Sequence, residues 1–351
     1  MPKVLVVATS RKTRGGITSV INAHEQGQQW SLFHCHWVQT HRDGNPLRKL
    51  GYLIGALIDF CCRLPFYDIV HIHISEPVSA LRKIPFFVLS KILGKKTIIH
   101  FHSFSPETTI LGMCRNVYKY LFTHADCVIV LSEFWKEIII KNLPVNYNAI
   151  RVLYNPCPQC LIDKDVETKM QILYAGTLNE RKGYKDLIKA FALIAKRYPD
   201  WKIVFAGNGE IETGKNLAKN LGIAVQTEFI GWITGNMKAK VFQESSIFCL
   251  PSYAEGFPMA VLDAWAYGLP VITTPVGGIP DVAQDGKNMM LFMPGDTNTL
   301  AAKMDMMIRD VSLRNAIREE SVKLSQTIFN IKVINERLGD IYTDVANARR
   351  G

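Results

Sequence analysis

The residues best suited to do chemistry lie together in one short stretch of the C-terminal half. They are Glu255, Gly256, Phe257, Pro258, Met259 and Ala260, followed by Asp263. We expect a strand to end near residue 250 and a helix to begin near Phe257 or Pro258, because proline suits the first helical turn. Free N–H groups at a helix start bind phosphate, and a carboxylate accepts hydrogen bonds from paired sugar hydroxyls. Glu255 and Asp263 lie about two helical turns apart, so both can face one ligand. The alternative is an acid at a helix start and an ordinary surface aspartate.

Two loops that contain glycine could add phosphate contacts. Residues 176–183 follow an expected strand, precede an expected helix and include Arg181 and Lys182. An arginine can hold a diphosphate with two hydrogen bonds and a lysine acts on it as a point charge, although a solvated basic turn is the alternative. Gly15 and Gly16 follow the first expected strand, where a backbone without side chains can approach a ligand closely. This pair lacks the three spaced glycines of a dinucleotide-binding fingerprint.

The positive charge of the chain is concentrated in its first part. The net charge is +10, of which residues 1–155 carry +9, and all nine histidines lie between His24 and His124. This asymmetry favours an anionic surface or ligand for the first part, with ordinary solvated lysines as the alternative. Nucleic acid is not an expected partner, because the sequence has no zinc-finger, helix-turn-helix or basic-aromatic RNA motif.

The spacing of apolar residues predicts two α/β domains, each with a doubly wound parallel sheet, and a cleft between them. Short β-branched segments alternate with helical ones, stop at the prolines of residues 155–160 and then resume. With 351 residues, 48% of them hydrophobic, the chain can form two cores and is neither disordered nor fibrous. We place the first domain at residues 1–157 and the second at 158–331, with a C-terminal helix of about residues 332–351 returning to the first. In the first domain, strands are expected at 4–8, 69–74, 97–102, 127–131 and 150–154, and one helix at 84–93.

A cytoplasmic location is expected. The first residues contain too short an apolar run for a signal peptide, and no stretch reaches about 18 uninterrupted apolar residues. The eight cysteines are then expected as reduced thiols.

Two further patterns resemble metal or redox sites. Cys157 and Cys160 have CxxC spacing, but neither a second pair nor a nearby histidine completes a zinc site. His71 and His73 are expected on one face of a strand, which is compatible with a metal ion. We favour buried or cleft-lining histidines over metal ligands at these positions.

A series of short motifs runs along nearly the whole chain, and those of the second domain are the more specific. In order they are Gly15-Gly16, Val70-His71-Ile72-His73, Ile99-His100-Phe101-His102-Ser103, Val152-Leu153-Tyr154-Asn155, Ala175-Gly176-Thr177, Lys182-Gly183, Ala206-Gly207-Asn208-Gly209, Phe229-Ile230-Gly231, residues 251–266, Gly268-Leu269-Pro270-Val271-Ile272 and Gly277-Gly278-Ile279-Pro280. Taken together, the chain resembles the retaining glycosyltransferases of family 4, the EX7E-type enzymes with a GT-B fold.

The resemblance implies a nucleotide-diphosphate sugar as the donor and no metal cofactor. It implies that Lys182 binds the diphosphate, Glu255 contacts the donor sugar, Asp263 holds the ribose diol and His102 hydrogen-bonds to the transferred sugar. The expected catalytic residues are His102, Lys182 and Glu255. The expected nucleotide-sugar-binding residues are Gly15, Gly16, Arg181, Trp232, Ile233, Gly256, Phe257, Pro258, Met259, Ala260 and Asp263, with Trp232 and Ile233 near the base.

The sequence departs from the family pattern at two positions. Asp263 stands in the place of the second glutamate, so its carboxylate has a shorter reach. Thr177 stands where many relatives carry an arginine, and we expect Arg181 to supply that charge. The predicted activity is transfer of a hexosyl or N-acetylhexosaminyl group, with retention, to a hydroxyl of a glycan or lipid-linked acceptor in cell-surface polysaccharide synthesis. The alternative is a catalytically weakened relative that binds nucleotide sugar or glycan as a scaffold.

Two segments of the first domain combine cations with bulky apolar residues. They are residues 47–54 and 82–89. Such a face could rest on the anionic inner leaflet of the plasma membrane and meet a polyprenyl-diphosphate-linked acceptor. The alternative, which is left open, is that both segments are helices that pack on the first sheet.

Overall fold

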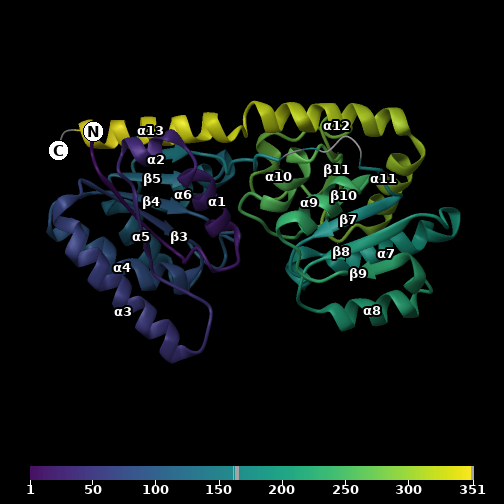
Figure 1. Cartoon of the computed structure of the whole chain (residues 1–351), viewed down its shortest axis with the longest axis horizontal. Coiled ribbons are helices and arrows are strands. Elements are labelled where there is room, and N and C mark those ends of the chain that lie inside the picture. The colour runs from purple at the N-terminus through teal and green to yellow at the C-terminus, as the bar shows by residue number, and fades with distance from the viewer. Residues whose placement is uncertain (161, 163–165, 349–351) are drawn as a thin grey trace. The chain divides into compact units, whose positions relative to one another are not determined.

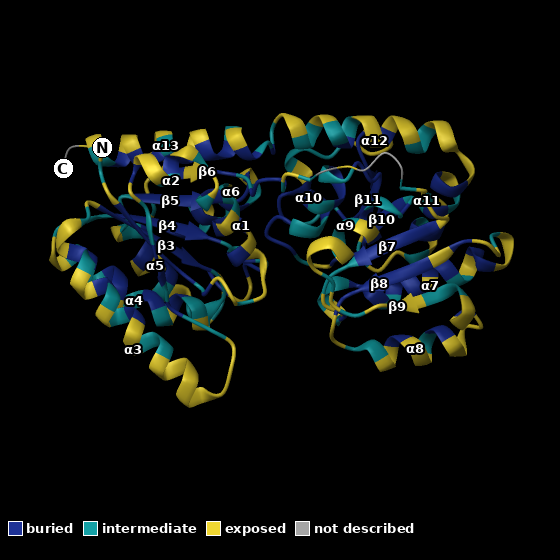
Figure 2. Ribbon diagram, viewed as in Figure 1, coloured by how far each residue is buried: buried dark blue, intermediate teal, exposed yellow. Residues whose placement is uncertain are grey.

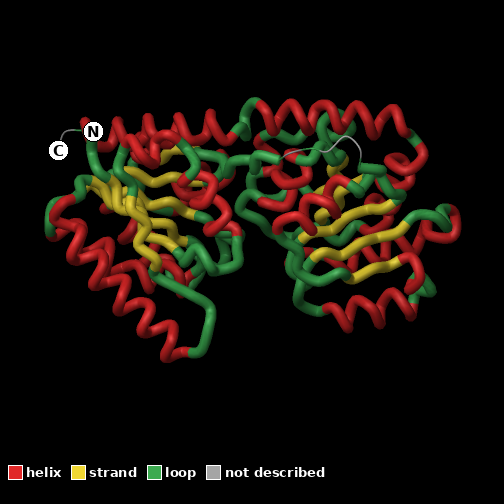
Figure 3. Tube along the Cα trace, in the orientation of Figure 1, coloured by secondary structure: helices red, strands yellow, loops and turns green. Residues whose placement is uncertain are grey.

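The computed structural model describes residues 1–160, 162 and 166–348, and the chain divides into two compact units. Unit 1 comprises Met1–Pro156 and Ile331–Gly351, and unit 2 comprises Cys157–Asn330. The boundaries expected from the sequence, after residues 157 and 331, each lie one residue later than the boundaries in the structure. In each unit the helices lie on both sides of the strands (Figure 3).

Unit 1 contains a six-stranded sheet in which every pairing is parallel, in the order β2-β1-β3-β4-β5-β6. Most of these strands are short runs of β-branched residues that are buried on both faces, as parallel strands require. The strands are β1 (Val4–Ala8), β2 (His36–Gln39), β3 (Ile69–Ile74), β4 (Lys96–Phe101), β5 (Cys127–Val130) and β6 (Ile150–Val152) (Figure 1).

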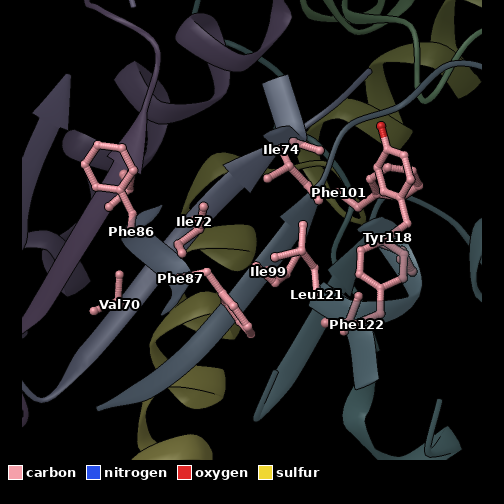
Figure 4. Close-up of a cluster of buried hydrophobic side chains, with 14 of the residues drawn as sticks. Val70, Ile72, Ile74, Phe86, Phe87, Ile99, Phe101, Tyr118, Leu121 and Phe122 are labelled. Atoms are coloured by element: carbon pink, nitrogen blue, oxygen red, sulfur yellow. The ribbon is translucent and has the colours of Figure 1, made fainter. Parts of the chain in front are cut away.

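Helices of unit 1 cover both faces of this sheet, because alternate strand residues point to opposite sides. One face carries Val70, Ile72 and Ile99, which pack against Phe86, Phe122 and other buried side chains of four helices (Figure 4). These helices are α3 (Pro46–Arg63), α4 (Pro77–Ile92), α5 (Arg115–His124) and α6 (Glu133–Asn142). The other face is covered by α1 (Gly16–Glu25), α2 (Gln28–Leu32) and α13 (Ile331–Asn347), and short 3₁₀ turns occur at η1 (Leu64–Phe66) and η2 (Tyr147–Ala149).

The expected helix at residues 84–93 is wrong at its start, because α4 begins seven residues earlier. Pro77 occupies its first turn, where a missing N–H breaks no helical bond, and Pro85 lies in the helix interior. This difference matters because α4 carries the buried Lys83 against the sheet.

The C-terminal helix α13 belongs to unit 1 and is held there by apolar and polar contacts. Its residues Ile334, Leu338 and Tyr342 join the core on the β1 side of the sheet. Asn335 accepts hydrogen bonds through Oδ1 from His24 Nδ1 at 2.8 Å and from Gln29 Nε2 at 3.0 Å. A buried polar cluster of this kind specifies one position of the helix, because a shift would leave its members without partners.

Unit 2 repeats the plan with a parallel sheet of order β12-β11-β10-β7-β8-β9. Its strands are β7 (Gln171–Ala175), β8 (Lys202–Ala206), β9 (Thr227–Phe229), β10 (Ile247–Leu250), β11 (Val271–Thr273) and β12 (Met290–Leu291). Its helices are α7 (Tyr184–Ile194), α8 (Ile211–Asn220), α9 (Gly235–Gln243), α10 (Met259–Ala266), α11 (Thr297–Arg309) and α12 (Val311–Gln326). The 3₁₀ turns are η3 (Glu180–Lys182), η4 (Ala195–Arg197), η5 (Ala224–Gln226) and η6 (Ile279–Asp281).

Within the described part of the chain, we find no helix with the length and apolar character needed to cross a membrane. All eight cysteines are free thiols, including Cys157 and Cys160.

Replacement of Asn335 by leucine tests the polar contact between α13 and the rest of unit 1. Asn335→Leu removes the hydrogen-bond partner of the buried His24 Nδ1. We expect the free energy of unfolding to fall by about 1–3 kcal/mol, the cost of a buried polar group without a partner. Urea denaturation measures this change. The control Glu336→Leu, at an exposed position of the same helix, should change it by less than about 0.5 kcal/mol; equal losses would contradict the assignment.

Candidate functional site in unit 2

The first part of the site is the loop between β7 and α7, which carries Arg181 and Lys182 in the 3₁₀ turn η3. The side chain of Asn179 begins this turn by accepting a hydrogen bond from the backbone N–H of Lys182 at 3.0 Å. Gly183 ends it with a left-handed φ of 66°, a conformation that glycine adopts without strain. The turn therefore places both cations directly beyond the carboxyl end of a central strand.

The second part is the loop between β10 and α10, which carries Glu255. Its Oε1 lies 2.5 Å from Lys182 Nζ and 3.5 Å from Arg181 Nη1, and Ser252 Oγ donates a hydrogen bond to it at 2.7 Å. The carboxylate is buried. Since β7 and β10 are neighbours in the sheet, their carboxyl ends bring these two loops together.

Backbone contacts hold the two loops in this arrangement. Tyr253 N donates to Arg181 O at 2.7 Å, and Arg181 Nη1 donates to Ala254 O at 2.6 Å. A Cβ at Gly183 would lie 1.9 Å from Pro251 O, so only glycine permits this approach. The cations and the carboxylate are thus positioned by backbone packing as well as by their charges.

The charge state of Glu255 follows from two opposing effects. Burial by itself raises the pKa of a carboxyl group, but the charges of Lys182 and Arg181, with the hydrogen bonds from Lys182 and Ser252, outweigh burial and lower the pKa of Glu255. The side chain is therefore an ionised acceptor at neutral pH. It can accept hydrogen bonds from hydroxyl groups and cannot donate a proton.

The structure places Asp263 in a different ion pair from that of Glu255. Asp263 Oδ1 lies 2.6 Å from Lys238 Nζ, which comes from α9. Burial raises the pKa of Asp263, and Lys238 opposes this effect. No motif in the sequence links Lys238 to Asp263, so this partner could not be predicted; the one signal is the place of Lys238 shortly after Trp232 and Ile233.

The start of α10 lies one to two residues later than the sequence suggests. Pro258 is the residue before its first turn, and the helix begins at Met259. The first N–H groups of a helix have no acceptor inside it, so those of Met259 and Ala260 can bind an anion. The ring of Phe257 packs 5.0 Å from that of Phe329, so its side chain is part of the core, and Gly256 O accepts from Gly278 N at 2.8 Å.

Trp232, Ile233 and Thr177 follow the ends of strands in unit 2 and differ in exposure. Trp232 follows β9 and has 40% of its surface exposed, whereas Ile233 beside it is partly buried. Thr177 is exposed, and its carbonyl accepts from Tyr174 Oη at 2.9 Å. Besides Lys182, this loop provides Arg181 as a cation, and Arg181 contacts Glu255.

In unit 1, the predicted residues lie at the carboxyl ends of β1 and β4. Gly15 has a φ of 152° at the start of α1, and a Cβ there would meet no atom within 4 Å. Gly16 is the first residue of the helix. His102 directly follows β4 and is partly buried, with Nε2 2.9 Å from His73 Nδ1.

Behind His102 lies a group of buried histidines. His71, His73 and His100 each offer a ring nitrogen, and these nitrogens lie within 4.8 Å of one another, a spacing that could hold a metal ion. Burial lowers the pKa of His24 to about 4 and, with the nearby His24 and Lys83, that of His102 to about 3. Burial and neighbouring histidines also lower the pKa values of the other three. All of these rings are neutral at pH 7.

Comparison with known proteins agrees with this architecture. The model of the family described as glycosyl transferases group 1 matches residues 163–324, and that of glycosyltransferase family 4 matches residues 37–158. An uncharacterised glycosyltransferase of Haemophilus influenzae is 31% identical over 233 residues, which cover 65% of this chain and 64% of that protein. A 41.2 kDa protein in the cps region of Klebsiella pneumoniae is 23% identical, over 86% of this chain and 89% of that protein.

The fold has close structural counterparts. The crystal structure of Anabaena HepE in complex with UDP matches with a TM-score of 0.78 at 17% identity, over 97% of this chain and all of that one. The same protein in complex with UDP-glucose matches with a TM-score of 0.76. Two parallel α/β units of this kind are the GT-B fold. The chain belongs to glycosyltransferase family 4, the glycosyl transferases group 1.

The buried histidines predict a loss of stability in mild acid. Their pKa values in the folded protein lie below the value of about 6.5 expected in the unfolded chain. The unfolded chain therefore binds more protons as the pH falls below about 6.5. Each histidine then lowers the free energy of unfolding by up to about 1.4 kcal/mol per pH unit, until the pH reaches its folded pKa.

Urea denaturation between pH 7 and pH 5 measures this loss, because the carboxylates titrate mainly at lower pH. The control His124→Gln removes an exposed histidine and should leave the slope unchanged. Stability that stays constant from pH 7 to pH 5 would contradict burial of the neutral rings.

Proposed function

We propose that this chain transfers a hexosyl or N-acetylhexosaminyl group from a UDP-sugar to a hydroxyl of a glycan or lipid-linked acceptor, with retention of the anomeric configuration. The observation that carries the proposal is the meeting of Lys182, Arg181 and Glu255 at the carboxyl ends of β7 and β10. UDP and UDP-glucose in the HepE complexes, and the cps region of the Klebsiella relative, support a nucleotide-sugar donor and a role in surface polysaccharide synthesis.

The leaving group of this reaction is a nucleoside diphosphate, so its developing negative charge must be stabilised. Lys182, Arg181 and the N–H groups at the start of α10 supply positive charge and hydrogen-bond donors without rearrangement, as preorganised electrostatic catalysis requires. We propose that this set suffices without a metal ion. Glu255, being ionised, accepts hydrogen bonds from the donor sugar hydroxyls and keeps both cations in place.

The other predicted residues then take complementary roles. Asp263, with its partner Lys238, holds the ribose diol, and Trp232 and Ile233 contact the base. In unit 1, His102 hydrogen-bonds to the transferred sugar and the loop of Gly15 and Gly16 approaches the phosphates.

Substitutions of Lys182 and of Glu255 should differ in their effect on the binding of UDP itself. Lys182→Ala removes a cation and should weaken UDP binding at least about tenfold, the effect of losing roughly 1.4 kcal/mol. Glu255→Gln removes a negative charge close to the diphosphate, so UDP binding should not weaken, while sugar transfer should fall by about 100-fold. Calorimetry with UDP and release of UDP from UDP-sugars measure the two effects.

The control for these variants is Lys202→Ala, which breaks the exposed ion pair with Glu228 in the same unit and should alter neither quantity. Equal UDP binding by Lys182→Ala and the native protein would refute the proposed donor site. Tight, selective UDP-sugar binding with no turnover on any acceptor would instead favour the scaffold alternative.

We also propose that unit 1 docks on an anionic membrane through α3, which would bring a lipid-linked acceptor within reach. Leu47, Leu50, Ile54 and Ile58 recur at the spacing of one helical face and are all exposed, Leu47 by 81% and Ile58 by 61%. Much of the length of α3 is exposed in Figure 2. The second basic segment behaves differently, because Lys83, Phe86 and Phe87 are buried against the sheet.

Flotation with liposomes of anionic phospholipid at low salt tests this docking. The native protein should float, and Ile54→Glu combined with Ile58→Glu should abolish flotation, because each change places a charge where apolar contact is needed. The control Val225→Glu alters an exposed aliphatic residue of unit 2 and should float normally. Failure of the native protein to bind, or a concentration-dependent dimer lost in the double variant, would refute the membrane proposal.

A further inference from the structure

The histidines of unit 1 form one continuous group because of strand register. In the parallel pair β3·β4, His73 lies opposite His100. Side chains alternate along a strand, so His71 and His73 share a face with His100 and, two residues further along, His102. The ring centroids lie 4.3 Å apart for His71 and His73, 4.8 Å for His73 and His100, and 4.2 Å for His100 and His102. The group therefore leads from the core to the partly exposed ring of His102.

The hydrogen bonds of the buried members have a definite direction. Tyr342 on α13 is buried, and its hydroxyl lies 2.8 Å from His71 Nδ1, the one hydrogen-bond partner found for it among the described residues. A buried hydroxyl must donate its proton, so His71 Nδ1 accepts and its Nε2 carries the hydrogen. His71 Nε2 then donates to His100 Nδ1 at 3.3 Å. These two rings are thus held in single tautomers by a residue of the C-terminal helix.

His73 makes the contact that matters for His102. Its Nδ1 lies 2.9 Å from His102 Nε2, and both rings are neutral, so one nitrogen donates and the other accepts. Among the described residues no group bonds to His102 Nδ1, which remains the nitrogen for a ligand. If His102 Nε2 carries the hydrogen of the bond to His73, then His102 Nδ1 is an acceptor. If His73 Nδ1 carries that hydrogen, then His102 Nδ1 is a donor.

The backbone of His73 is held as firmly as its ring. Lys83 is fully buried on α4, and its side-chain Nζ donates to the carbonyl of His73 and to Ser79 Oγ, the latter at 3.1 Å. Helix α4 lies on the opposite face of the sheet from His102. Lys83 therefore holds the backbone of β3 at His73, the residue whose ring contacts His102. Such double support fixes a ring more closely than packing alone.

A hydrogen-bonded network accounts for these rings better than a metal site. The metal-compatible group found among the described residues contains three histidines and no carboxylate, and Lys83 lies against His73. A divalent cation there would be buried beside a lysine without an anion to offset its charge. In the network derived above, His71 Nε2 donates to His100 Nδ1, so a metal ion on either of these two nitrogens would break that hydrogen bond.

We propose that His73 is a positioning residue for His102: it holds the ring through Nδ1 and fixes the tautomer that presents His102 Nδ1 to the transferred sugar. The buried rings of His71 and His100 and the hydroxyl of Tyr342 form the support behind this pair. The catalytic consequence rests on the proposed function, in which His102 contacts the sugar, whereas the tautomer itself is a property of unit 1 alone.

The tautomer is measured by long-range ¹H–¹⁵N correlation spectra of protein labelled with ¹⁵N-histidine. The native protein should show His102 as one neutral tautomer. His73→Leu removes the hydrogen-bonding nitrogen and should give a mixture of tautomers. His73→Asn keeps an amide group near the position of Nδ1 and should restore a single form. A native spectrum with mixed His102 tautomers, or a single unchanged tautomer in His73→Leu, would overturn the proposal.

Kinetics with a UDP-sugar provide the second measurement. In His73→Leu, we expect kcat to fall on the order of 10- to 100-fold, as small misplacements of a reacting group do, while KM for the donor changes less than about twofold. His73→Asn should recover part of kcat, and the exposed-residue control His124→Leu should match the native protein. If His73→Leu does not fold, the more conservative Tyr342→Phe should still loosen the tautomers of His71 and His100.

The two measurements separate the possible failures. The native protein could show no UDP-sugar activity and still show a single His102 tautomer that His73→Leu disturbs. That result would refute the proposed function and leave the positioning role intact. A loss of kcat in His73→Leu with an unchanged His102 spectrum would refute positioning. One tightly bound metal ion per chain, removed by His71→Gln, would also overturn the network and assign the histidines to a metal.

Discussion

A buried carboxylate is the constraint around which unit 2 is arranged. Glu255 is removed from water, and an isolated ionised carboxylate in such a place costs several kcal/mol. Lys182 and Arg181 offset that cost only if their loop lies against the loop of Glu255, within hydrogen-bonding distance for Lys182. The close approach of Gly183 to Pro251 and the backbone bond between Tyr253 and Arg181 make that distance possible. The two loops, and with them the ends of β7 and β10, therefore depend on one another.

The two units prepare their functional groups by opposite electrostatic means. Unit 2 uses ion pairs, Lys182 with Glu255 and Lys238 with Asp263, and in the first of these the two cations lower the pKa of the carboxyl group. Unit 1 uses histidines that burial keeps in the neutral form, with one N–H each, and whose orientations are set by hydrogen bonds. Charged groups suit the stabilisation of a diphosphate leaving group, whereas a neutral ring suits hydrogen bonding to an uncharged sugar. Lys182, Glu255 and His102 lie beyond the carboxyl ends of parallel strands, where α/β sheets bind their ligands.

The same physical arguments explain which basic segments of unit 1 are structural. The segment of α4 buries Lys83, Phe86 and Phe87, and its lysine satisfies the carbonyl of His73. On α3, Ala56 and Phe60 are the buried residues, and an apolar face is left exposed. Cations and bulky apolar residues are present in both segments, so composition alone could not separate them. The position of each helix on the sheet decides which of its faces meets solvent.

The sequence by itself determined the parallel α/β plan, the bounds of β1 and β3, and the loops that carry Lys182, Glu255 and His102. Each of these follows from local patterns: buried β-branched runs, and glycine or proline at the ends of strands and helices. The tertiary structure decided the partners of the charged and polar groups. Lys238 pairs with Asp263, Tyr342 bonds to His71 across 271 positions of the chain, and Lys83 supports His73 from the far face of the sheet. Such pairings depend on strand register and helix packing, which bring together residues that no local sequence pattern connects.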